Sequence, residues 1–121
     1  MATKLVIMVT HGPGDPEMAT IPFVMGVAAL ASEMEVVMGF QSNGVYLIKK
    51  GIAETVHANG FDSLKDLMDT FVEEGGKLYV CGPCIQSRNI NPETDFVEGA
   101  KVVSAATFAG ELAEAQNALT Y

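Results

Sequence analysis

Short apolar runs alternate with longer segments of helical periodicity along this chain. Four runs are rich in strand-forming residues: 4–9, 35–40, 77–81 and 100–103. The first shows no alternation of apolar and polar positions, which favours a strand covered on both faces, as in a parallel sheet. Three longer segments carry helix start signals or apolar positions at helical spacing, and they predict helices: 16–32, 63–74 and 104–119.

Local signals refine these boundaries. Asp15 before Pro16 predicts an N-cap with proline in the first turn, although Pro22 inside the same helix favours a later start or a kink. Ser63 predicts the next N-cap, and Gly75-Gly76 predicts its end. Weaker patterns predict a short helix over 45–50, a loop over 54–61 and a turn over 91–96, while Phe108, Leu112, Ala115 and Leu119 form the stripe of the last helix.

The alternation of strands and helices predicts one α/β domain over residues 1–121. We expect three layers, with a mainly parallel sheet of four to five strands flanked by helices. Ligand sites in such folds lie beyond the carboxyl ends of the strands. Three loops meet that description: Thr10–Asp15, Gln41–Gly44 and Cys81–Cys84.

Composition and charge exclude several classes of function. The formal net charge is −8, and the largest basic cluster is Lys49-Lys50, so a nucleic-acid backbone would be repelled. No apolar run reaches the length of a membrane span, and no signal-peptide pattern opens the chain, so we expect a cytoplasmic protein. Charged residues make up only 18%, which favours a homo-oligomer that buries part of the surface.

Both cysteines and the only arginine fall within eight residues of one another. Cys81 ends a predicted strand, Cys84 follows Gly82-Pro83, and Arg88 lies four residues after Cys84. A free thiol titrates at about pH 8.5, and a helix N-terminus or a nearby cation favours the reactive thiolate. The spacing therefore predicts sulfur or redox chemistry at these thiols. Small buried apolar residues are the plainer alternative for cysteines.

The other two loops supply weaker candidates for an anion or substrate pocket. These residues are Thr10, His11, Gly12, Asn43 and Gly44, with Gly82 of the thiol turn. His11 is a possible proton donor or acceptor, and an ordinary loop histidine is the alternative. A zinc site with two cysteines would need both His11 and His57, so we expect no metal. No phosphate-binding loop is present, so we expect no cofactor, FMN included.

The sequence resembles the DsrE/DsrF-like family, specifically its small stand-alone members with a C-x-x-C motif, which are often labelled predicted peroxiredoxins. Four blocks carry the resemblance and together span almost the whole chain. The first block is the first strand with residues 12–17 and 19–23, and the second is 43–47 with Lys50-Gly51. The third is 79–84 with Arg88 and Ile90, and the fourth is 98–103 with Ala105-Ala106.

The resemblance implies a flavodoxin-like domain that assembles as trimers or hexamers. Its sulfur-relay relatives, which include the TusD subunits, carry sulfur as a cysteine persulfide that they exchange with a small TusA-like protein. Their active cysteine ends this strand seven residues before an arginine, a position that corresponds to Cys81. Cys84 is the additional cysteine, and Asn89 stands where many relatives have glycine after the arginine. Asparagine also tolerates a positive φ.

These observations favour a cytoplasmic sulfur-relay protein with a persulfide on Cys81, possible sulfurtransferase activity, and release assisted by Cys84. The family resemblance ranks Cys81 first, whereas helix-terminus electrostatics alone favour Cys84. Two alternatives remain open at this point. One is a thiol–disulfide oxidoreductase that uses the Cys81/Cys84 pair, and the other is a non-catalytic oligomeric module that binds a small ligand.

Overall fold

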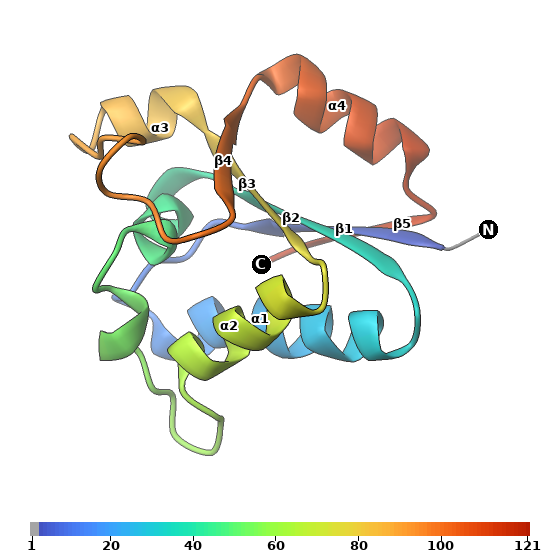
Figure 1. The fold of residues 1–121 in the computed structure, drawn as a ribbon, viewed down its shortest axis with the longest axis horizontal. Coiled ribbons are helices and arrows are strands. Elements are labelled where there is room, and N and C mark those ends of the chain that lie inside the picture. Colours follow the sequence, from blue (N-terminus) through green and yellow to red (C-terminus); the bar gives the residue numbers. More distant parts are fainter. Residues whose placement is uncertain (1–2) are drawn as a thin grey trace.

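A parallel five-stranded sheet forms the centre of the computed structural model, which describes residues 3–121 (Figure 1). The strands lie in the order β4-β3-β2-β1-β5, and every neighbouring pair is parallel. Their bounds are β1 (Lys4–Val9), β2 (Glu35–Phe40), β3 (Lys77–Cys81), β4 (Ala100–Val103) and β5 (Asn117–Thr120). This arrangement confirms the predicted flavodoxin-like α/β fold.

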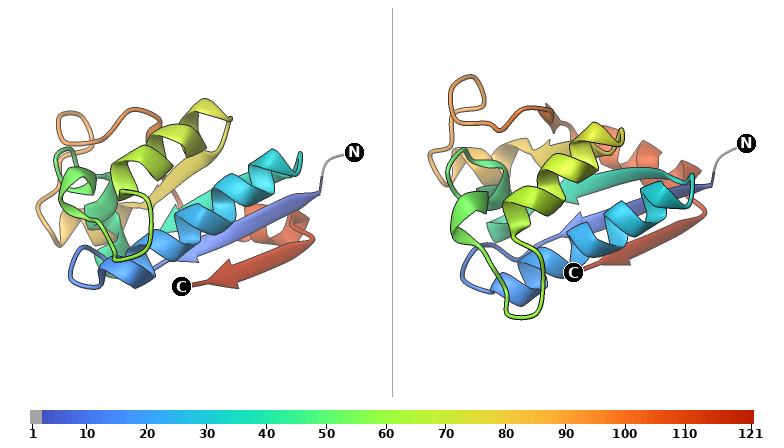
Figure 2. Two further views of the ribbon diagram at one scale, coloured as in Figure 1. Left: turned by 90° about the horizontal axis from the view of Figure 1, so that it is seen from below. Right: turned by 60° about the horizontal axis from the view of Figure 1, so that its bottom comes forward.

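Helices cover both faces of the sheet and make the three layers. The α-helices are α1 (Pro16–Ala31), α2 (Leu64–Glu73), α3 (Gly82–Gln86) and α4 (Ala105–Glu114), and two 3₁₀ helices are η1 (Ser42–Ile48) and η2 (Ala53–Thr55). Helices α1 and α2 pack side by side on one face, and α4 lies alone on the other (Figure 2). The short α3 continues directly from the carboxyl end of β3.

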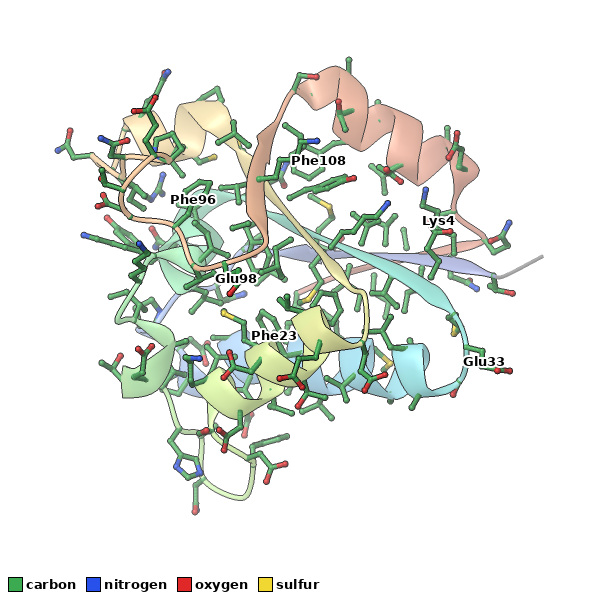
Figure 3. The ribbon with its side chains drawn as sticks, in the orientation of Figure 1. Lys4, Phe23, Glu33, Phe96, Glu98 and Phe108 are labelled. Carbon is green, nitrogen blue, oxygen red and sulfur yellow. The ribbon has the colours of Figure 1, made fainter. Side chains whose placement is uncertain are left out.

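The main core lies between the sheet and the α1–α2 layer. Phe23 of α1 contacts Phe71 of α2 edge to face, with ring centroids 5.8 Å apart, and Phe40 of β2 at 6.0 Å. All three rings are fully buried. A smaller cluster on the opposite face places Phe108 of α4 against Val6, Met8 and Val37 (Figure 3). Both faces of the central strands are therefore apolar, as their continuous apolar sequence predicts.

The predicted helix caps are present. The Asp15 side chain accepts a hydrogen bond from the Met18 N–H at 3.2 Å, and the Ser63 hydroxyl accepts one from the Asp66 N–H at 3.3 Å. The later start of α1 that Pro22 favoured is wrong. The helix begins at Pro16, and Pro22 is buried inside it. Asp15 and Pro16 fix the start because they satisfy the first turn.

Three predicted segments need correction. The helix expected over 45–50 is a 3₁₀ helix that starts earlier, over Ser42–Ile48, and the loop expected over 54–61 overlaps the 3₁₀ turn Ala53–Thr55. The helix expected over 104–119 ends at Glu114, and Asn117–Thr120 forms β5 beside β1. Leu119 therefore belongs to a strand, and Leu112 of α4 is exposed rather than buried.

The first three strands end at one edge of the sheet, where their following loops meet. A Cβ on Gly12 would lie 2.5 Å from the Asn43 carbonyl oxygen, and one on Gly44 would lie 2.1 Å from the Val9 carbonyl oxygen. Only glycine allows such close backbone approach. None of the helices within residues 3–121 is both long enough and apolar enough to cross a membrane.

Candidate functional site

Two free thiols lie where β3 passes into α3. Cys81 is the last residue of β3 and caps α3, and Cys84 follows in the first turn behind Pro83. Both cysteines are half-buried and free, and the Cys84 side chain lies near enough to the Cys81 thiol to affect its pKa. The strand-to-helix turn predicted from C-G-P-C is thus present, and both thiols belong to it.

The two thiols nevertheless pack against opposite faces of the sheet. Cys81 packs with Tyr79 and Val103 against the small cluster under α4. Cys84 packs against the main core on the α1–α2 side. Because β3 alternates its side chains, Tyr79 and Cys81 share one face, and α3 then carries Cys84 round to the other. Each thiol therefore has different neighbours.

Burial raises the pKa of the Cys81 thiol above its ordinary value. The Cys84 side chain raises this pKa further, whereas the Cys84 backbone N–H and the charge of Arg88 lower it without reversing the shift. The expected lowering of a thiol pKa by the turn amides and the arginine is therefore outweighed at Cys81. Desolvation disfavours the thiolate there more than the nearby donors favour it.

A backbone amide from the neighbouring loop points at the other sulfur. The Ser42 N–H donates to Cys84 Sγ at 3.4 Å. Ser42 has φ of 51°, a left-handed conformation that a serine adopts only at a cost. Sequence reasoning identified the loop 41–44 but not Ser42, because nothing in the sequence marks a serine for positive φ.

Arg88 ties the same loop to α3. Its Nε and Nη2 donate to Asn43 Oδ1 at 3.2 and 3.0 Å, and its Nη1 donates to the Cys84 carbonyl oxygen at 3.2 Å. The guanidinium also lies 5.8 Å from the centre of the Tyr46 ring. No carboxylate within residues 3–121 lies within ion-pair distance of Arg88. Its positive charge is held by neutral partners beside the thiols.

A cavity of about 310 Å³ adjoins this cluster, and we call it the His11 cavity. Its walls come from the loop after β1 and from η1: Thr10, His11, Gly12, Pro13, Gly14, Asp15, Asn43 and Tyr46. Four of the six predicted pocket residues therefore line one cavity. The other two do not line it: Gly44 is buried where its backbone meets Val9, and Gly82 lies beside Val102. Tyr46 was missed, because a half-buried aromatic residue carries no distinctive sequence signal.

A larger hollow of about 490 Å³ lies elsewhere, beside α2. Charged side chains such as Glu54, Lys65 and Glu73 surround Met68, Val72 and Val97 there. Neither thiol lines this hollow. The candidate site is therefore the smaller region at the strand ends, where the thiols, Arg88 and the His11 cavity come together.

Comparison with known proteins identifies the family. Residues 3–121 match the model of the DsrE/DsrF-like family. The chain is 30% identical to MJ0989 of Methanocaldococcus jannaschii over 98% of this chain and 99% of that one. It is also 32% identical to MJ0760 of the same organism, over 92% of this chain but only 40% of that longer protein. The names of these two relatives state no activity.

Solved structures share the fold. The ychN protein from E. coli superposes with a TM-score of 0.82 at 16% identity, covering 98% of this chain and 99% of that one. MTH1491 from Methanobacterium thermoautotrophicum gives a TM-score of 0.73 at 14% identity, with the same coverage of both chains. Together with the family match over residues 3–121, these similarities show that the chain belongs to the DsrE/DsrF-like family, which is known for sulfur relay.

Proposed function

We propose that this chain carries sulfane sulfur as a persulfide on Cys81, in cooperation with Cys84. The observation that carries the proposal is the pair of free thiols at one strand-to-helix turn, beside an arginine whose charge no carboxylate neutralises within the described residues 3–121. A persulfide is an anion near neutral pH, so a fixed cation beside the thiols favours the loaded state. Membership of a sulfur-relay family supports the same reading.

The residues around the thiols have distinct roles in this proposal. Arg88 supplies positive charge, and Asn43 holds the guanidinium in place through two hydrogen bonds to one oxygen. The His11 cavity admits the small end of a sulfur donor. Gly12 and Gly44 allow the close approach of the two segments around that cavity, Thr10 lines it, and Gly82 lies between the two cysteines.

We further propose that the protein is a cytoplasmic homo-oligomer, a trimer or hexamer, that exchanges sulfur with a small TusA-like protein. Exposed apolar side chains support the oligomer. Val102 of β4 is 38% exposed, and Leu112 of α4 is 40% exposed. Phe108 is the one buried residue of α4, so this face of the sheet is thinly covered compared with the α1–α2 face.

The test is sulfur transfer to an acceptor. The protein is loaded with a low-molecular-weight persulfide, freed of excess donor, and mixed with a TusA-like acceptor whose mass is then measured. The wild-type chain should pass one sulfur atom to the acceptor, and Cys81→Ser should pass none. Transfer by Cys81→Ser at the wild-type rate would overturn the assignment to Cys81.

A thiol–disulfide oxidoreductase is the second candidate, favoured by the two free thiols at one strand-to-helix turn. In that reaction, the Cys81/Cys84 pair loses two electrons and closes a disulfide. A defined dithiol/disulfide potential, together with turnover on a glutathione-linked substrate and no sulfur loading, would favour this candidate over the persulfide carrier.

A further inference from the structure

We propose that Cys84 takes up sulfur first and then passes it to Cys81, so that the two thiols act as successive stations. This inference rests on the proposed function and adds an order to it. The family resemblance gives priority to Cys81, but the surroundings of the two sulfur atoms point the other way. The reasons lie in the contacts of Cys84, in its side of the sheet edge and in the neighbouring cavity.

The first reason is the donor at Cys84. The Ser42 N–H reaches Cys84 Sγ at 3.4 Å and comes from a residue held at a φ of 51°. A donor of this kind stabilises negative charge on sulfur, both in the attacking thiolate and in the persulfide that follows. A backbone in an unfavourable conformation that aims a donor at a reactive atom is typical of functional sites.

The second reason is the placement of Cys84 on the side of the sheet where the His11 cavity admits a small donor. Ser42 precedes Asn43, which lines the His11 cavity and also binds Arg88. Tyr46 likewise lines the cavity and lies under the guanidinium. One segment, which contains Ser42, Asn43 and Tyr46, therefore contacts Cys84 and Arg88 and also lines the cavity. Cys81 packs on the other side with Tyr79 and Val103.

The chemistry balances without an added oxidant or reductant. The Cys84 thiolate attacks the outer sulfur of a donor R–S–SH, the donor S–S bond breaks, and R–S⁻ leaves. Cys81 then attacks the terminal sulfur of the Cys84 persulfide, and the S–S bond at Cys84 breaks. The proton of the Cys81 thiol moves to the departing Cys84 sulfur three residues along the same turn. The sulfane sulfur ends on Cys81, on the face of the sheet that α4 covers.

The order is tested by rapid mixing with glutathione persulfide, a quench with N-ethylmaleimide and peptide mass mapping. Cys81→Ser should gain sulfur on Cys84 at the wild-type rate and retain it there. Cys84→Ser should load Cys81 about tenfold more slowly, the scale of one hydrogen bond to a charged group. Loss of uptake in Cys81→Ser, or equal rates in both variants, would overturn the order.

A second readout separates this inference from the proposed function. Substoichiometric iodoacetamide should label Cys84 before Cys81 in the wild-type chain, even if no sulfur is ever loaded. Ser42→Gly keeps the amide and the positive φ and should keep this preference, whereas Ser42→Val disfavours that conformation and should reduce it. First labelling of Cys81, or an unchanged preference in a folded Ser42→Val variant, would contradict the role given to Cys84 and its donor.

Discussion

Two residues near the thiols hold a left-handed backbone without being glycine. Asn89, at φ of 56°, closes the turn after α3, where its N–H donates to the Gln86 carbonyl oxygen at 3.3 Å. Asparagine is one of the few side chains that accept this conformation, as the sequence comparison with Arg-Gly relatives implied. Ser42, at φ of 51°, is the less expected case, and it is the residue that donates to Cys84.

The conformation at Asn89 predicts a sharp difference between two substitutions. Asn89→Val should lower the free energy of unfolding by about 1–2 kcal/mol, because a β-branched residue is strained at positive φ. Asn89→Gly should not lower it. Urea unfolding followed by circular dichroism measures both, and equal destabilisation in the two variants would show that φ is not the cause.

Arg88 predicts that uptake depends on the charge of the donor. Arg88→Gln should slow sulfur uptake from anionic thiosulfate by about tenfold, because the guanidinium is a charge-assisted donor that glutamine cannot replace. Reaction with a neutral dialkyl trisulfide, in which the thiolate attacks the central sulfur, a mixed trisulfide forms and R–S⁻ leaves, should slow much less. Mass spectrometry of timed samples gives both rates. An equal slowing with both donors would mean that Arg88 acts only by holding α3 to the loop at Asn43.

Among the α-helices, α4 is the least buried, and one lysine holds its carboxyl-terminal end to the sheet. Lys4 of β1 is mostly buried and forms ion pairs with Glu111 and Glu114 of α4 and, at 4.0 Å, with Glu35 of β2 (Figure 3). The ion pair with Glu111 is the main reason that the pKa of Lys4 is raised. This cluster joins α4 to the amino-terminal edge of the sheet, away from the thiols.

The raised pKa of Lys4 predicts a stability contribution that is lost in alkali. The contribution is fully present below the ordinary value of 10.5 and disappears as pH rises through the higher folded pKa. Lys4→Met should therefore be less stable than wild type at about pH 8, with a smaller difference at about pH 11.5. Urea unfolding at both values tests this, with Lys101→Met at an exposed position of β4 as the matched control. A difference that grows in alkali would contradict the account.

The sequence predicted β1 to β4 and the N-terminal caps because their signals are local. It missed β5 because Phe108, Leu112, Ala115 and Leu119 also fit a helical stripe. Only pairing with β1 makes Asn117–Thr120 a strand, and such a long-range contact leaves no local pattern. At the site, the C-x-x-C spacing located both thiols and Arg88. The hydrogen bonds from Ser42 and to Asn43 depend on where separate loops meet, so spacing could not predict them.

At the scale of the whole molecule, the exposed apolar side chains predict self-association. Sedimentation velocity should give about three or six times the chain mass of 12.8 kDa. Leu112→Glu should shift the distribution toward the single chain, because it places a charge on the exposed face of α4. A wild-type mass of one chain would contradict the proposed assembly without affecting the thiol chemistry.

The most direct test of the central claim is the intact mass of the protein after exposure to a sulfane-sulfur donor. The wild-type chain should gain the mass of one sulfur atom and lose it again on treatment with dithiothreitol. The double variant Cys81→Ser/Cys84→Ser should gain nothing. A wild-type mass that stays unchanged, or a gain of equal size in the double variant, would contradict a persulfide carried by this pair.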